Sequence, residues 1–309
     1  MQTASVEGQA GGDSAPCSFT PAAEPGPDPP RPTVASRAAA SLPWYDYAEI
    51  EWATQTFWTA IAARLRALGL GEVPDQLRID DEYEGVWREP SLLLSQCCGY
   101  DAVLPYRGVL RVVATPCYRA PGCVGSTYSS FVIVREDSPF RTLADLSGSR
   151  CVINNPTSHS GVNCLRALVA PLSHNGRFFS AVFATGSHTR SLQFIQDRQA
   201  EVAAIDCVVV ALLRRLRPEL LRGLRTLAVT PAAAAPPYVT RASLPAHGVR
   251  LLRQALADVV ADPRLEDVRQ ALLIEGVEFL PLEAYEPMAE LHQAASAQGY
   301  FEMEAALPR

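Results

Sequence analysis

The sequence predicts an α/β fold with mixed, mostly parallel sheets. One observation is a series of short apolar or β-branched runs, at residues 109–115, 131–134, 151–153, 181–184, 202–205 and 224–229. A second is that helical patterns separate several of them, at residues 161–172, 188–198 and 207–216. Strands that alternate with helices form parallel sheets, because a parallel connection needs a crossover helix.

The remaining elements expected from periodicity lie before and after this alternating region. Residues 53–68 carry apolar side chains at the spacing of one helical face, namely Phe57, Ile61, Leu65 and Leu68. Gly69 ends that pattern. The tail at residues 247–298 has a helical pattern throughout, with breaks at Pro263 and Pro281.

The composition favours a globular chain with small-molecule ligands. The 309 residues are 48% hydrophobic and 19% charged, enough for one large core or two modest ones. A net charge of −6, without a basic block, argues against a nucleic-acid partner. Since no apolar run reaches about 18 residues, we expect a soluble protein.

The first 40 residues differ in composition from the rest. They are rich in Gly, Ala and Pro, with seven prolines between Pro16 and Pro32. Such a segment buries too little apolar surface to offset the entropy of ordering, so we expect disorder over residues 1–40. It also lacks a basic start followed by an apolar run. As encoded, the chain is expected in the cytoplasm; with a misassigned start, it would be periplasmic or membrane-associated.

The eight cysteines lack the spacing of a metal site. None forms a CxxC pair, and no histidine follows at a matching interval, so we expect neither a metal nor a cofactor. Most should be small buried apolar side chains. In an exported protein, Cys98 could pair with Cys117 or Cys123.

Polar residues recur at four turns where a strand-like run leads into a helix. In α/β folds, ligands bind outside the carboxyl ends of the strands. The four turns hold Ser158 to Gly161, Thr185 to His188, Asp206, and Gln96 to Tyr100. Four such turns together predict a shared cleft.

Residues 158–161 stand where a helix is expected to begin. A helix N-terminus carries four unpaired N–H donors and a partial positive charge, so Ser158, Ser160 and Gly161 suit an anion. An ordinary N-cap by either serine explains the same residues. His188 has the same two interpretations, as a donor to an anion or as a helix cap.

Several motifs make the chain resemble the phosphonate-type substrate-binding proteins of ABC transporters, which have the type II periplasmic-binding-protein topology. They cover nearly all of residues 41–309. The motifs are SLPWYD at 41–46, LLLSQCCGY at 92–100, APGC at 120–123, TYSSFVIVRED at 127–137, LADLSGSRCVINNPTSHSG at 143–161, TGSHTRSL at 185–192 and VAAIDC at 202–207.

The resemblance implies a two-lobed clamshell, each lobe a mixed, mostly parallel sheet flanked by helices. Lobe one would hold residues 41–127 with 231–309, and lobe two residues 128–230. Two crossing strands, near residues 128–132 and 226–230, would form the hinge.

The resemblance also implies a ligand-binding set. The oxyanion would bind at Ser158, Ser160 and Gly161, and Tyr128 and Ser129 would face it from the hinge. Asp206 has two interpretations: it caps the next helix, or it faces the cleft and selects ligands with an amine, such as aminoalkylphosphonates. The full predicted set is Tyr45, Asp46, Gln96, Tyr100, Tyr128, Ser129, Ser158, Ser160, Gly161, His188 and Asp206.

The function implied is capture of a small oxyanion, a phosphonate- or phosphate-like solute, for uptake through an ABC permease. We expect a monomer without catalytic activity. The alternative is a cytosolic enzyme or sensor on the same fold, chorismate-dehydratase-like or related to pyrimidine precursors. No Ser–His–Asp or Cys–His set can be argued from spacing, which favours binding.

Overall fold

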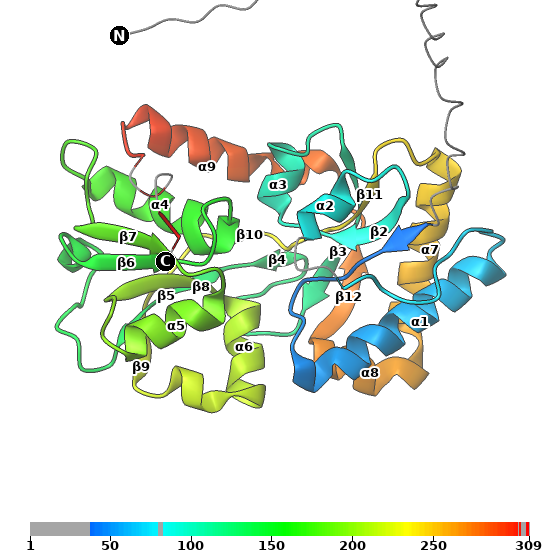
Figure 1. Cartoon of the computed structure of the whole chain (residues 1–309), viewed down its shortest axis with the longest axis horizontal. Helices are drawn as coiled ribbons and strands as arrows, with labels where there is room; N and C mark the ends of the chain where they lie inside the picture. The colour runs from blue at the N-terminus through cyan, green and yellow to red at the C-terminus, as the bar shows by residue number, and fades with distance from the viewer. Residues whose placement is uncertain (1–37, 80–82, 302, 304–306, 309) are drawn as a thin grey trace, which may run out of the picture. The chain divides into compact units, whose positions relative to one another are not determined.

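The computed structural model describes residues 38–79, 83–301, 303 and 307–308 (Figure 1). The predicted disordered segment, residues 1–40, lies mostly outside the described residues, although Ala39–Ala40 at its end form strand β1. In the part of the chain that is described, no helix combines the length and apolarity needed to cross a membrane.

The first sheet has five strands in the order β1, β2, β11, β3, β12. After β1 come β2 (Leu92–Gln96), β11 (Tyr238–Arg241), β3 (Leu110–Tyr118) and β12 (Ile274–Glu278). β11 and β12 run antiparallel to their neighbours, so antiparallel pairs predominate here. The helices α1 (Glu51–Ala67), α7 (Ala246–Ala261) and α8 (Glu266–Leu272) pack together on this sheet (Figure 1).

The second sheet has six strands in the order β13, β7, β6, β8, β5, β9. Their bounds are Leu307–Pro308, Ala181–Ala184, Arg150–Ile153, Val202–Asp206, Ser130–Arg135 and Leu224–Val229. The central strand β6 is parallel to β7 and β8, whereas β5 is antiparallel to β8 and β9. The carboxyl ends of β6, β7 and β8 therefore meet at one edge.

Helices cover both faces of the second sheet, with α4 (Cys164–Val169) and α5 (His188–Gln196) on opposite sides (Figure 1). Successive side chains of β5 accordingly enter different cores: Val132 packs with α4 and Ile133 with α5. Helix α6 (Cys207–Leu216) packs in two directions. Val208 and Leu212 join the core of the first sheet, and Val209 and Leu213 that of the second.

Two short strands connect the sheets. β4 (Thr127–Tyr128) joins β3 to β5, and its antiparallel partner β10 (Ala233–Ala234) joins β9 to β11. The predicted hinge near 128–132 overlaps β4, whereas 226–230 lies mostly in β9, just before the second crossing. The predicted lobe boundaries stay a prediction. After β12, helix α9 (Glu286–Ala297) runs along α4 (Figure 1) and brings Ala295 into the core of the second sheet.

The predicted α/β class with mixed sheets and a two-strand connection is confirmed, although the first sheet is mostly antiparallel where a mostly parallel one was expected. The expectation of a wholly helical tail is wrong. Leu273 adopts a left-handed conformation with φ of 58° that ends α8, and the next residues form β12. β12 pairs with the end of β3, so a distant strand decides its conformation. The helix expected after the turn at Gln96 to Tyr100 is α3 (Gly99–Val103), whereas α2 (Tyr83–Trp87) was not predicted.

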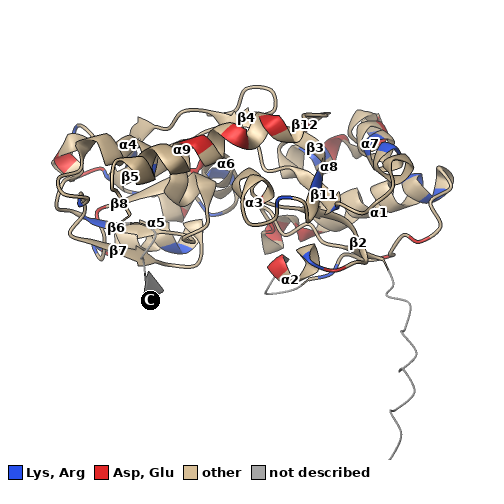
Figure 2. Cartoon of the chain, turned by 90° about the horizontal axis from the view of Figure 1, so that it is seen from above, with Lys and Arg blue, Asp and Glu red and all other residues tan. Residues whose placement is uncertain are grey.

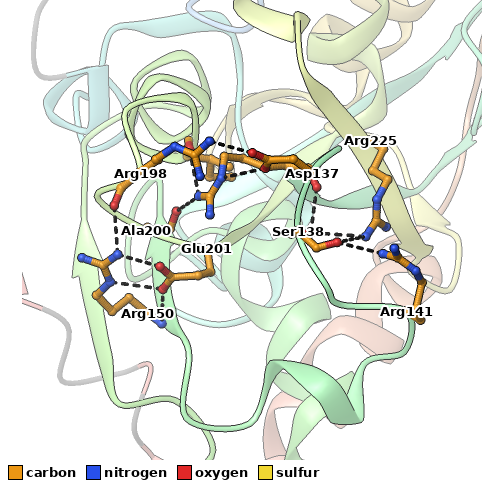
Figure 3. Close-up of polar contacts among 10 residues, drawn as sticks. Asp137, Ser138, Arg141, Arg150, Arg198, Ala200, Glu201 and Arg225 are labelled. Carbon is orange, nitrogen blue, oxygen red and sulfur yellow. Dashed lines mark hydrogen bonds and ion pairs between the residues drawn. The ribbon is translucent and has the colours of Figure 1, made fainter.

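Ion pairs hold the edge of the second sheet opposite to the carboxyl ends of β6 and β8. Figure 3 shows Arg150 at the start of β6 paired with Glu201, which precedes β8, at 2.6 Å. Arg198 and Arg135 both contact Asp137. Elsewhere, acidic and basic residues are interspersed along the chain (Figure 2).

Candidate functional site

A polar cavity of about 510 Å³ lies at the carboxyl ends of β6, β7 and β8. Its other wall comes from residues 43–48, the start of α3, and Tyr128 of β4. The lining residues are Pro43, Trp44, Tyr45, Asp46, Tyr47, Ala48, Cys98, Asp101, Tyr128, Asn154, Asn155, Thr157, Ser158, Ser160, Ser187, His188, Thr189, Asp206, Val209 and Arg217.

The turn after β6 brings two serine hydroxyls to the cavity. Ser158 is the N-cap of a π-helical turn, His159–Asn163, and its Oγ accepts a hydrogen bond from the Gly161 amide at 3.1 Å. Ser160 Oγ lies 3.1 Å from His188 Nε2 and 3.5 Å from Ser158 Oγ. The two hydroxyls and the helix start form a polar corner that suits an oxyanion.

A second helix start, that of α5, reaches the same corner. Ser187 is its N-cap and accepts a hydrogen bond from the Arg190 amide at 3.2 Å. Burial lowers the pKa of His188 to about 4, so this imidazole is neutral near pH 7. His188 therefore takes part as a hydrogen-bonding group that positions Ser160, and the hydroxyls of Ser187 and Thr189 extend the corner.

Asn154 joins these two turns. Its carbonyl accepts from the Gly186 amide at 2.8 Å, which ties the turn after β6 to the turn after β7. Its side chain lies against Gly161, where an added Cβ would come within 1.8 Å of Oδ1. Within the described part of the chain, this Oδ1 is buried and has no hydrogen-bond partner. The Asn154 Oδ1 is thus packed against Gly161 and buried in the wall of the cavity.

Asp206 lies at a third helix start and both caps α6 and lines the cavity. Oδ1 accepts from the amides of Val208 and Val209 at 2.7 and 3.4 Å, and Oδ2 accepts from the Tyr45 hydroxyl at 2.9 Å. Burial raises the pKa of Asp206 to about 6, although these hydrogen bonds act in the opposite direction. Asp206 therefore caps α6 and lines the cavity at the same time, because its two carboxylate oxygens have different partners.

Residues 43–49 reach across the cavity to the helices of the second sheet. Tyr45, held at φ of 60°, sends its hydroxyl to Asp206. At the rim, Arg217 donates to Glu49 Oε1 at 2.6 Å and to Oε2 at 2.9 Å, and its guanidinium lies 5.4 Å from the centre of the Tyr47 ring. These contacts close one side of the cavity.

Seven residues of the predicted binding set line the cavity: Tyr45, Asp46, Tyr128, Ser158, Ser160, His188 and Asp206. Gln96 is instead buried against Tyr118 and Pro236, to which its Nε2 donates at 3.0 and 2.9 Å. Tyr100 bonds His292 at 2.7 Å. The remaining two, Ser129 and Gly161, are also outside the lining, and ligand contact by any of these residues stays a prediction.

Sequence reasoning missed several lining residues. Asn154, Asn155 and Thr157 stand in the same turn as Ser158, so the rule about carboxyl ends of strands could have found them. Asp101 and Arg217 gave no such signal, because only the folded chain brings them to the cavity. Burial, with the charge of Glu84 adding to it, raises the pKa of Asp101 to about 7.

Residues 102–285 match the family model of the periplasmic substrate-binding proteins of phosphonate ABC transporters. The chain belongs to this family. The match includes the three turns of the second sheet that carry the cavity hydroxyls and Asp206. None of the curated proteins compared with this binding protein matches its sequence.

Solved structures share the fold of this family member at low sequence identity. A phosphonate-transporter binding protein from Pseudomonas aeruginosa is 17% identical, with a TM-score of 0.68 over 85% of this chain and 87% of its own. A protein from Prochlorococcus marinus in complex with methylphosphonate is 12% identical, with a TM-score of 0.69 over 84% and 98%. A protein from Xanthomonas citri bound to ATP is 16% identical, with a TM-score of 0.65 over 85% and 98%.

No metal centre is visible in the described part of this binding protein, where no three His, Cys, Asp or Glu side chains are grouped to hold an ion. The polar groups that line the cavity include hydroxyls, amides, carboxylates, the His188 imidazole and the Arg217 guanidinium.

Proposed function

We propose that the chain captures a small phosphorus oxyanion, a phosphonate or phosphate-like solute, in this cavity and delivers it to an ABC permease. The observation that carries the proposal is the meeting of two hydroxyl-capped helix starts, those after β6 and β7, at one corner of the cavity. Three oxygens of a phosphonate group can accept hydrogen bonds from such hydroxyls and amides. Membership of the phosphonate-binding family supports the same ligand class.

The oxyanion would lie against Ser158, Ser160 and Thr189, with the organic substituent toward Tyr45 and Tyr128. The cavity of about 510 Å³ is within the usual range of roughly 300 to 1,000 Å³ for small-molecule sites. It therefore leaves room for a substituent beyond the phosphorus group, and aromatic rings are suited to cover such a substituent.

The charges of the lining favour a ligand that also carries an amine. Asp46, Asp101 and Asp206 are acidic, whereas Arg217, the one arginine among the described residues of the lining, is already paired with Glu49. An ammonium group near Asp206 would compensate the buried carboxylate, so we propose aminoalkylphosphonates as the preferred class. Because the pKa of Asp206 is about 6, this preference should grow as the pH rises through 6.

Calorimetric titration with a panel of solutes tests the proposal. The panel is phosphate, phosphite, methylphosphonate, 2-aminoethylphosphonate, its carboxylate analogue β-alanine, and uracil. Binding of at least one phosphorus oxyanion, tightest for 2-aminoethylphosphonate at pH 7.5, is the expected result. Heat from β-alanine or uracil alone would overturn the oxyanion assignment and favour the enzyme or sensor alternative.

The remaining parts of the proposal concern the chain in the cell. We propose a monomer that acts in the periplasm, as the family description indicates, and that leaves its ligand chemically unchanged. Cell fractionation and light scattering test the first two points. For the third, the ³¹P spectrum of the ligand after its release by denaturing the protein should be identical to that of the ligand as added, and a new phosphorus resonance in the released material would contradict a pure binding role.

A further inference from the structure

Two cysteines far apart in the sequence lie next to each other beside the crossing strand β4. Cys123 belongs to the loop between β3 and β4, and Cys207 is the first residue of α6. Their Sγ atoms are 3.4 Å apart, although 84 positions separate the residues. A disulfide bond is about 2.0 Å long, so the sulfur atoms need to approach by about 1.4 Å.

The backbone brings the loop unusually close to Cys207. At Gly122, with φ of 95°, an added Cβ would lie 2.8 Å from Cys207 Cβ and 3.1 Å from its Sγ. Only a glycine permits this approach and this conformation together. The loop is fixed by the Cys123 amide, which donates to Ala120 O at 3.0 Å, and Cys207 by its own amide, which donates to Ser129 O at 3.1 Å.

The two thiols differ in access. Cys123 is half-buried in a loop whose neighbour Val124 is 81% exposed, whereas Cys207 is buried. The hydrogen bond with Cys123, then burial and the charge of Asp206, raise the pKa of the Cys207 thiol. Since the thiolate is the reactive form, an external reagent should meet Cys123 first.

We propose that Cys123 and Cys207 form a disulfide bond by exchange with a disulfide-bearing oxidant, such as oxidised glutathione or a disulfide oxidoreductase. The Cys123 thiolate attacks one sulfur of the oxidant and releases its first thiolate. The Cys207 thiolate then attacks Sγ of Cys123 and releases the second. The two protein thiols lose two protons and two electrons, and the oxidant is reduced to two thiols.

This bond would link the loop before β4 to the residue that follows Asp206. Asp206 lines the cavity, and α6 packs against both cores. Oxidation would thus hold the start of α6 to the crossing between the sheets. The expectation that Cys98 pairs with Cys117 or Cys123 gives way to a different partner, because Cys207 is the thiol that the fold places beside Cys123.

The sequence makes the test simple, because trypsin cleavage after Arg119, Arg135, Arg198 and Arg214 leaves Cys123 and Cys207 each as the single cysteine of its own peptide. Cys123 falls in peptide 120–135 and Cys207 in peptide 199–214. The reduced full chain is incubated with oxidised glutathione, alkylated in denaturant, digested and analysed by mass spectrometry. The expected result is a linked pair of these two peptides, lighter by two hydrogens than their sum and lost on reduction.

Recovery of both peptides as alkylated thiols, as glutathione adducts, or linked to other cysteines would overturn the proposal. Cys123→Ser and Cys207→Ser should each abolish the linked pair, whereas Cys117→Ser, next to a carboxylate of Glu278 in the first sheet, should leave it unchanged. Gly122→Ala should slow its formation at least several-fold. The mapping needs no ligand, so its outcome is independent of the proposed solute.

Discussion

Asp206 accepts hydrogen bonds from two backbone amides and one tyrosine hydroxyl, yet its carboxylate remains costly to ionise in the folded chain. The donors stabilise the charged form, and burial destabilises it more. The result is an acid whose charge changes as the pH passes through about 6. Such a group links stability to proton binding.

Asp206→Asn should change how stability depends on pH. The pKa of Asp206 rises from 3.8 unfolded to about 6 folded, so between these values the folded state binds more protons. The stability contributed by the protonated acid is complete below pH 4 and is lost as the pH rises through 6, a loss on the order of 3 kcal/mol. The free energy of unfolding of the variant, measured with urea at each pH, should not show this loss.

The control for that measurement is Asp145→Asn. Backbone hydrogen bonds from Arg141 and Thr142 lower the pKa of Asp145, so its contribution has the opposite sign and fades as the pH falls. This variant should keep the wild-type loss of stability between pH 4 and 6. Equal pH profiles for Asp206→Asn and the wild type would contradict the assignment.

Substitutions at two serines of one turn test ligand binding and helix capping. Ser160→Ala should weaken binding of a phosphorus oxyanion by roughly 1.5 to 3 kcal/mol, because a hydrogen bond to a charged group is lost, and should lower stability by about 1 kcal/mol, because the buried His188 Nε2 loses its partner. Ser158→Ala should also cost about 1 kcal/mol of stability, since Ser158 caps the turn. Titration calorimetry and urea unfolding give the two values. Ser173→Ala, outside the cavity, is the matched control.

At the scale of helices and strands, local pattern predicted those elements whose neighbours in sequence are also their neighbours in space. The turn after β6 and the start of α6 were recognised because a strand, a polar turn and an apolar helix follow one another directly. β12 was missed because its conformation depends on pairing with β3, more than a hundred residues away. Arg217 was not predicted as a lining residue for the same reason, because it contacts Glu49 only in the folded chain.

The residues of the candidate site also divide into those that local sequence could predict and those that depend on distant contacts. Predictions that rested on strand ends placed Ser158, Ser160 and His188 at the cavity. Gln96 and Tyr100 were chosen by the same rule, but the folded chain gives their polar groups partners in Tyr118 and His292. No periodicity in the sequence distinguishes a polar side chain that meets a ligand from one that meets another side chain.

The pairing of Glu49 with Arg217 joins the start of α1 to the end of α6 across the cavity rim. Both side chains are about one-third exposed, at 37% and 35%, so we expect a modest coupling. A double-mutant cycle with Glu49→Gln and Arg217→Gln should give a small favourable coupling at low salt and a smaller one at high salt. A coupling that does not respond to salt would show that the pair is linked through something other than charge.

At the scale of the whole molecule, the chain returns to each sheet after leaving it. β4 and β10 carry it between the sheets, and α9 brings the last helix against α4. Residues distant in sequence therefore meet at the crossing, where Cys123 and Cys207 lie. A crosslink there closes a long loop, which restricts the unfolded chain strongly.

Oxidation of this pair should raise the free energy of unfolding. For a separation of 84 positions, the chain-entropy model gives about 4.6 kcal/mol, and disulfides typically contribute about 2 to 4 kcal/mol. Urea unfolding of the oxidised and reduced wild type measures this difference. The Cys207→Ser variant should show none under the same two conditions, and a difference that persists in it would assign the effect to other cysteines.

Gly161 has a consequence for redesigning selectivity. A methyl group at this position would overlap the Asn154 amide, and that amide's backbone holds the neighbouring turn through Gly186. The packing of Gly161 against Asn154 therefore leaves little room for substitutions in this part of the polar corner. Residues 43–48 of the opposite wall are better placed for variation, because their members Asp46 and Ala48 are exposed. A library that seeks new ligands should therefore randomise that wall and leave the serine turn as it is.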